Sequence, residues 1–116
     1  MQVTRIYTGD DGESHFEEVE IEMKATGLAG VLSDPWPATG VIFREVDGNY
    51  DLDFHTAPRR QLVVNLTGSV DIETGSGEVR RLGPGSILLA EDLTGRGHKS
   101  RNVDGEPRQC LFVPLA

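Results

Sequence analysis

The fold class is inferred mainly from residues 53–68, which have the sequence DFHTAPRRQLVVNLTG. After Pro58, the β-branched and apolar run from Gln61 to Leu66 predicts a strand, and Thr67-Gly68 predicts the tight turn that ends it. Residues 83–102, GPGSILLAEDLTGRGHKSRN, predict a turn, a buried strand at 86–90, a glycine-bracketed loop at 92–97 and a strand opened by His98. His55 and His98 are therefore expected to begin two strands about forty residues apart in the sequence, and in an antiparallel barrel such positions can face one another.

The first of these stretches resembles the first cupin motif, G-x5-H-x-H-x3,4-E-x6-G. His55 falls on the first histidine of that motif, and Gln61 and Gly68 reproduce its end with glutamine in place of glutamate. Ala57 stands where the second histidine is expected.

The second stretch resembles the second cupin motif, G-x5-P-x-G-x2-H-x3-N. Gly95, His98 and Asn102 match the end of that motif, whereas Leu93 replaces its proline and the gap back to Gly85 is longer. The resemblance covers residues 39–114 and is closest to small single-domain cupins.

The resemblance implies an all-β fold, an antiparallel double-stranded β-helix or jelly-roll barrel, formed by residues 39–116. Residues 1–38 are expected to add N-terminal strands and a loop that pack on this barrel. Their acidic edge strands are expected either to face solvent or to form the contact of a homodimer. The pattern of nine or ten short strands with regular turns predicts a β-sandwich or barrel independently of the family.

Composition excludes several classes of function. The chain has 116 residues, 37% of them hydrophobic, which suits one soluble domain with its own core. A formal charge of −8 argues against nucleic acid as a partner, because phosphate binding relies on lysine and arginine. The start has no signal-peptide pattern and no apolar run is long enough to span a membrane, so we expect a cytoplasmic protein without a membrane partner. Cys110 is expected to be a buried core side chain.

The N-terminal part predicts strands at 2–8 and 17–23, joined by a hairpin turn through residues 9–12. Residues 24–40 lose this periodicity and predict a long loop. Trp36, between two prolines, is expected either to close the end of the barrel over the cavity or to plug the hydrophobic core.

Residues 41–46 and 49–54 predict a hairpin through Asp47-Gly48. Arg44 is unusual in this otherwise apolar strand. Its side chain either reaches solvent at an edge or points into the cavity as an anchor for an anion.

Strand alternation predicts which side chains converge. Residues 55, 57, 61, 63 and 65 share parity, so His55, Gln61 and Asn65 are expected to face the interior together. His98 is expected to enter from another strand with Asn102 on its face.

The cupin resemblance implies a metal site at His55, Gln61 and His98, suited to iron, manganese, nickel, copper or zinc. The missing carboxylate would have to come from Glu91 or Asp92. Without a metal, the two imidazoles remain competent acid–base groups, because histidine titrates near neutral pH.

Basic residues around both motifs suggest an anionic ligand. Arg59 is expected either to bind a small organic anion or, with Arg60, to brace the loop by pairing with a nearby carboxylate.

The leading hypothesis is a small-molecule enzyme that acts on a small carbonyl or aromatic compound through His55, His98 and Gln61. With a metal the reaction would be dioxygenase-like, and without one it would be isomerase- or cyclase-like. Arg44, Arg59, Asn65, Asn102 and Trp36 are the candidate substrate-binding residues. The alternative is a ligand-binding module without turnover.

Overall fold

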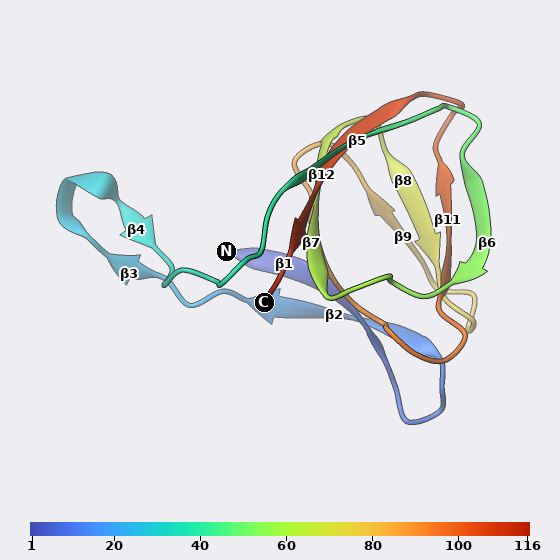
Figure 1. The fold of residues 1–116 in the computed structure, drawn as a ribbon, viewed down its shortest axis with the longest axis horizontal. Coiled ribbons are helices and arrows are strands. Elements are labelled where there is room, and N and C mark those ends of the chain that lie inside the picture. Colours follow the sequence, from blue (N-terminus) through green and yellow to red (C-terminus); the bar gives the residue numbers. More distant parts are fainter.

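The computed structural model describes residues 1–116, and the chain is all-β. A six-stranded sheet has the order β2-β1-β10-β7-β12-β5, a four-stranded sheet has the order β6-β11-β8-β9, and a small hairpin pairs β3 with β4 (Figure 1). No helix is long and apolar enough to cross a membrane. The elements are β1 (Gln2–Thr8), β2 (Ser14–Glu20), β3 (Lys24–Ala25), the 3₁₀ turn η1 (Gly27–Ala29), β4 (Val31–Leu32), β5 (Ile42–Val46), β6 (Asp51–His55), β7 (Gln61–Thr67), β8 (Val70–Glu73), β9 (Val79–Leu82), β10 (Ile87–Glu91), β11 (His98–Asn102) and β12 (Arg108–Pro114).

The all-β prediction is confirmed, but the sheets are neither wholly antiparallel nor closed. β1 lies parallel to β10, with Thr4 opposite Leu88, so the larger sheet is mixed. Each sheet keeps two edge strands, β2 and β5 in the larger and β6 and β9 in the smaller. The parallel pairing is possible because a long stretch of chain, residues 9–86, connects β1 to β10.

The two sheets pack face to face around one core. The buried apolar side chains come from both sheets, and Phe16 and Val63 pack against them at the margin. The cluster consists of Ile6, Ala57, Val70, Ile72, Leu82, Leu88 and Ala90. Burial of this shared apolar surface is the main force that holds the sheets together.

The first hairpin forms as predicted, but its second strand begins earlier than expected. The amide of Gly9 donates to the carbonyl oxygen of Glu13 at 2.8 Å, and Thr8 lies opposite Ser14. Because the turn fixes the register of a hairpin, β2 runs over 14–20 and not over 17–23.

The Asp47-Gly48 turn forms, but it does not make the predicted hairpin. The amide of Tyr50 donates to the carbonyl oxygen of Asp47 at 3.1 Å, yet β5 pairs with β12 and β6 pairs with β11. Gly48 lies against the backbone carbonyl of Gly105, where a Cβ atom would have no room. The turn therefore carries the chain from one sheet to the other.

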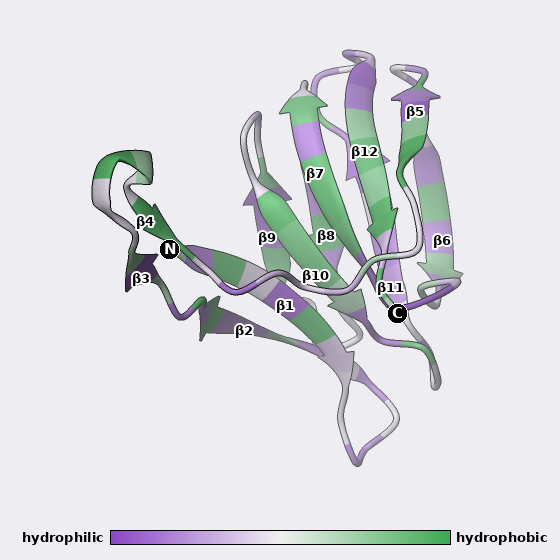
Figure 2. Cartoon of the chain, turned by 60° about the vertical axis from the view of Figure 1, so that its left-hand side comes forward, coloured by the Kyte–Doolittle hydropathy of each residue, from purple (hydrophilic) through white to green (hydrophobic).

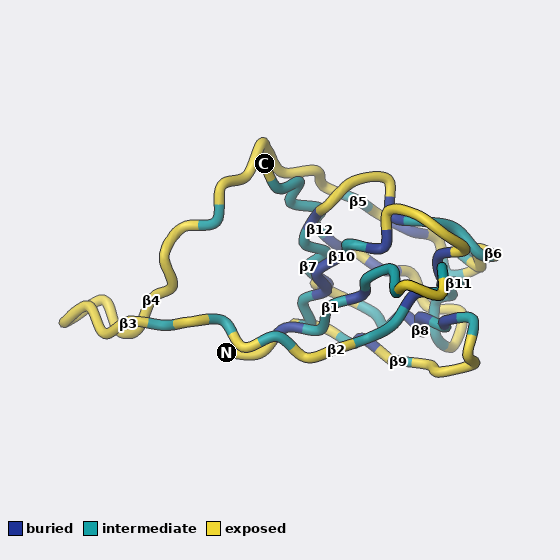
Figure 3. Tube along the Cα trace, turned by 90° about the horizontal axis from the view of Figure 1, so that it is seen from below, coloured by how far each residue is buried: buried dark blue, intermediate teal, exposed yellow.

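The β3–β4 hairpin forms an arm that extends away from both sheets (Figures 1 and 2). After it the chain returns to the larger sheet, where Ala38 pairs with Leu115 just beyond β12. Nearly all of the arm is exposed, including Leu28, Val31 and Leu32 (Figure 3). Trp36 is half-buried, lies outside the core cluster and does not line the cavity described below. The tryptophan therefore neither plugs the core nor closes the cavity, because the chain beside it pairs with the last residues of the protein. Its role in substrate binding stays a prediction.

Candidate functional site

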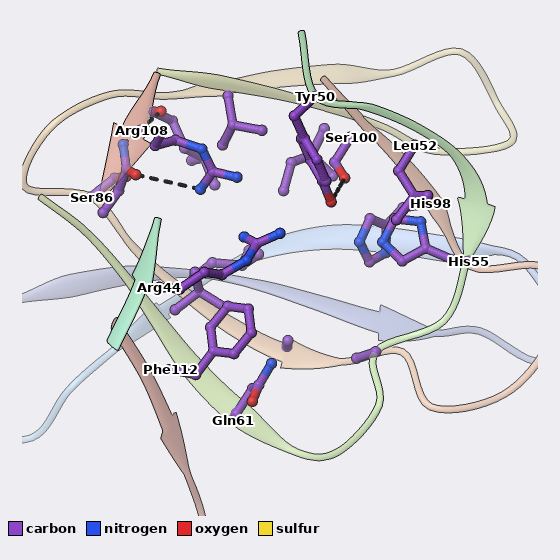
Figure 4. Close-up of a pocket in the computed structure, with 18 of the residues that line it drawn as sticks. Arg44, Tyr50, Leu52, His55, Gln61, Ser86, His98, Ser100, Arg108 and Phe112 are labelled. Atoms are coloured by element: carbon purple, nitrogen blue, oxygen red, sulfur yellow. Dashed lines mark hydrogen bonds between the residues drawn. The ribbon is translucent and has the colours of Figure 1, made fainter. Parts of the chain in front are cut away.

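A cavity of about 230 Å³ lies between the two sheets. Its lining is mainly apolar, and the polar groups that reach into it belong to a few side chains (Figure 4). Cavities of this type, with few convergent polar groups, are the usual form of small-molecule sites.

Two histidines stand side by side in the lining. His55 ends β6 and His98 begins β11, and the two residues are direct partners in the antiparallel ladder. Their ring centroids are 4.5 Å apart, with 56° between the ring planes. The histidines of the two sequence motifs therefore meet as neighbours within one sheet.

The close approach of these strands depends on Gly97. Its φ is +79°, a conformation that favours glycine, and the position of a Cβ atom would overlap the carbonyl group of His55. The glycine before His98 thus lets its strand start directly beside the end of β6.

His55 is held by its own strand. Its Nδ1 atom lies 2.8 Å from the carbonyl oxygen of Asp53. Because a carbonyl only accepts, Nδ1 carries the proton and Nε2 of the neutral ring is left as a base. Burial lowers the pKa of His55 below its usual value, the hydrogen bond to Asp53 opposes this, and charge on His98 lowers the pKa further.

His98 is held by a carboxylate. Its Nδ1 atom lies 2.5 Å from Oδ2 of Asp92, which is completely buried and also accepts a hydrogen bond from the hydroxyl of Ser14 at 2.7 Å. The carboxylate accepts from Nδ1–H and so fixes the orientation of the ring, with Nε2 left free to face the cavity. The second oxygen, Oδ1, has no hydrogen-bond partner. Sequence reasoning considered Asp92 as a metal ligand or as an ion-pair partner of Arg59 and Arg60, and not as the partner of His98.

Gln61 and Asn65 line the cavity together with Val63, as strand alternation predicts. Both amides are already engaged. Oε1 of Gln61 accepts from Nη1 of Arg59 at 3.0 Å, and Nδ2 of Asn65 donates to the carbonyl oxygen of Gly68 at 2.6 Å.

Two further candidates do not reach the cavity. Arg59 is exposed and touches the site only through Gln61. Asn102 instead ties loops together, because its Nδ2 donates to the carbonyl oxygens of Asp47 and Glu106. The structure thus places both side chains outside the cavity lining, and their role in substrate binding stays a prediction.

The donor set fits a divalent metal poorly. Glu91 lies outside the cavity lining, and its two oxygens accept from Nε of Arg5 and Nε of Arg60, each at 2.5 Å. These arginines hold the pKa of Glu91 below its usual value although burial alone would raise it. No group of three or more histidine, cysteine, aspartate or glutamate side chains is placed to hold a metal ion. We therefore derive no step through a metal.

Arg44 points into the cavity, the second of the two orientations considered from the sequence (Figure 4). Its guanidinium lies 5.1 Å from the ring of Tyr50 and 5.0 Å from the ring of Phe112. Electrostatic attraction to the ring faces favours these positions.

Sequence reasoning missed Arg108 and Tyr50. Arg108 is only 3% exposed and lines the cavity from β12. It shares strand parity with Cys110, which the sequence correctly predicts to be buried, so alternation along β12 was the signal that could have found it. The hydroxyl of Tyr50 lies 2.9 Å from that of Ser100.

Comparisons with known proteins give a likeness of fold. No family model matches the chain, and no curated protein matches it. A crystal structure of protein NMB1881 from Neisseria meningitidis is similar with a TM-score of 0.50 and 13% sequence identity. The similarity covers 66% of this chain and 72% of the other. At this identity it supports an all-β fold of the same kind and says nothing of activity.

Proposed function

We propose that the protein is a small cupin-type enzyme that moves protons on a small carbonyl compound. The observation that carries this proposal is the His55–His98 pair, with rings 4.5 Å apart in a mainly apolar cavity and with each Nδ1 fixed by a different acceptor. Two imidazoles held in different environments are suited to act as base and acid on one substrate.

The different environments suggest a role for each ring. His55 has a lowered pKa and a backbone acceptor on Nδ1, so it is the base that removes a proton from the carbon next to the carbonyl group. His98, when protonated, donates from Nε2 to the carbonyl oxygen while Nδ1 stays bonded to Asp92. The electron pair of the broken C–H bond forms the C=C bond of an enol, and return of a proton to carbon completes an isomerisation or epimerisation.

The cupin assignment rests on the sequence motifs and on the layered all-β architecture. His55 and His98 come from the two motifs and are neighbours in the cavity, which supports the assignment. A bound metal would add oxidation or Lewis-acid chemistry, but we build nothing on it. A module that binds a ligand without turnover is the alternative.

Deuterium exchange tests the proposal without knowledge of the natural substrate. The protein is incubated in D₂O with pyruvate, levulinate, dihydroxyacetone and butanone, and loss of the C–H signals next to each carbonyl is followed by proton NMR. We expect exchange above the buffer rate for some of these compounds, and its loss in His55→Gln and His98→Gln.

His15→Gln is the matched control, because His15 pairs with Asp11 on the surface and does not line the cavity. This variant should exchange like the parent protein. Binding of these compounds with no exchange above buffer would favour the ligand-binding module over the enzyme.

A further inference from the structure

The arginines of this acidic chain differ in their partners. Six of the nine form ion pairs with carboxylates: Arg5, Arg60, Arg80, Arg81, Arg96 and Arg101. The other three are Arg44, Arg59 and Arg108. Arg59 is exposed, whereas the remaining two line the cavity.

Arg108 is buried with neutral partners only. Its Nε donates to Oδ1 of Asn102 at 3.1 Å, and its Nη1 donates to Oδ1 of Asn65 at 3.4 Å. Burial lowers the pKa of Arg108, and the nearby charge of Arg44 lowers it further, but a guanidinium stays protonated in proteins. A buried charge without a counter-ion is unfavourable, so the free protein holds an uncompensated cation here.

Arg44 adds a second positive charge to the same space. Its only hydrogen bond to a side chain runs from Nη1 to Sγ of Cys110 at 3.7 Å, a weak acceptor. No aspartate or glutamate is among the residues that line the cavity. A chain with 19 acidic residues therefore leaves two guanidinium groups without a carboxylate in the mainly apolar cavity between its sheets.

We propose that Arg44 and Arg108 form a carboxylate-binding subsite, and that the natural ligand is a small organic carboxylate. The two guanidinium groups lie on one side of the cavity and the two imidazoles on the other (Figure 4). A guanidinium presents paired N–H donors in a plane, which match the two oxygens of a carboxylate. Tyr50 and Phe112 lie beside Arg44 and border the anion.

The dimensions and lining limit the ligand. A volume of about 230 Å³ lies below the roughly 300–1,000 Å³ of pockets for drug-sized ligands, so the molecule is small. The apolar lining suits a short hydrocarbon chain or ring better than a fully polar phosphate. The inference deepens the proposed function, because a carboxylate held at the arginines places the remainder of a short carbonyl compound towards His55 and His98.

Binding of an unreactive probe tests the subsite separately from catalysis. Propionate, neutral propionamide and inorganic phosphate are titrated into the ¹⁵N-labelled protein and followed by NMR. We expect propionate to bind and propionamide to bind at least about tenfold more weakly, because the neutral amide lacks the charge that strengthens hydrogen bonds to the guanidinium groups. Phosphate should also bind at least about tenfold more weakly, because the rest of the lining is mainly apolar.

Arg44→Gln and Arg108→Gln should each weaken propionate binding by about tenfold or more. Arg81→Gln is the control, because Arg81 is exposed, pairs with Asp71 and lies outside the cavity lining, and it should bind like the parent. The Arg44 side chain donates only a weak hydrogen bond to Sγ of Cys110, so we expect Arg44→Gln to fold. This variant tests the subsite even if Arg108→Gln fails to fold.

Three results would overturn the subsite: equal binding of propionate and propionamide, tighter binding of phosphate, or unchanged affinity in folded Arg44→Gln. Propionate has no reactive carbonyl group. Propionate can therefore bind even if no deuterium exchange is seen, which would support the subsite and oppose the proposed enzyme. Exchange seen only with the neutral compounds would support the proposed enzyme and oppose the carboxylate subsite.

Discussion

Nδ1 of His98 lies 2.5 Å from Oδ2 of Asp92, a carboxylate from which solvent is completely excluded. Asp92→Ala removes this partner and also leaves the hydroxyl of Ser14 without its acceptor. We expect a loss of about 2–6 kcal/mol in the free energy of unfolding, measured by urea titration, because two buried donors each lose their acceptor at a cost of about 1–3 kcal/mol. Asp92→Asn keeps the volume and an acceptor, and should cost about 1–3 kcal/mol.

Asp10→Asn is the control for removal of an aspartate. Asp10 is exposed and should change the free energy of unfolding by less than about 0.5 kcal/mol. If Asp92→Ala were as stable as this control, the buried pair would not contribute to the fold.

Gly97→Ala should disturb the two histidines. The residue has φ +79°, and a Cβ atom there would overlap the carbonyl group of His55. Gly77→Ala is matched, because Gly77 has φ +88° and open space around the Cβ position. In both variants alanine at a positive φ angle lowers the free energy of unfolding by about 1 kcal/mol or more. Only in Gly97→Ala must β6 also move away from β11.

Urea titration of the two glycine variants measures the difference, and proton NMR contacts between the imidazoles of His55 and His98 report on the geometry. We expect Gly97→Ala to be the less stable variant and to lose these contacts. Equal stability with the ring contacts intact would show that the close approach is not needed.

The lowered pKa of His55 predicts a pH dependence of stability. In the unfolded chain histidine takes up a proton near pH 6.5, whereas in the folded protein it does so only at lower pH. The unfolded state therefore binds more protons within this window, and stability falls as the pH decreases from about 6.5 towards the folded pKa.

The free energy of unfolding at pH 7.5 and pH 5.5 measures this effect. The loss at the lower pH should be smaller in His55→Gln than in the parent protein. Carboxylates with lowered pKa, such as Asp71 beside Arg81, are common to both proteins and cancel in the comparison. An identical pH dependence in the two proteins would contradict the assignment.

The homodimer expected from the sequence stays a prediction, and we expect its contact to lie on the β3–β4 arm. Leu28, Val31 and Leu32 are exposed there, and exposed apolar groups on an extended hairpin are typical of contact surfaces. We expect a dimer by sedimentation velocity, and a monomer for the double variant Leu28→Asp and Val31→Asp. Leu93→Asp, at an exposed leucine outside the arm, should stay dimeric.

Metal analysis tests the remaining implication of the cupin resemblance. From the donor set, we expect much less than one metal per chain after incubation with iron, manganese, nickel, copper or zinc and removal of free metal. Elemental analysis of protein purified without a chelating column measures this. Near-stoichiometric metal that is lost in His98→Ala would restore the metal site and make His98 a ligand.

The local features of this protein could be predicted from the sequence alone. The apolar run at 61–66, the turn after Gly9 and the alternation that turns Gln61 and Asn65 inward all follow from backbone and side-chain preferences within a few residues. The two histidines could be selected in the same way, because each lies at the boundary of a strand and a turn.

The pairing of the strands and the partners of the arginine side chains depend on the tertiary structure. The Asp47-Gly48 turn joins two sheets, because β5 pairs with β12 and β6 pairs with β11 instead of with each other. Arg59 and Arg108 are the same residue type, yet one is exposed and the other is buried facing the cavity. Such differences depend on contacts between residues far apart in the chain, which local pattern does not specify.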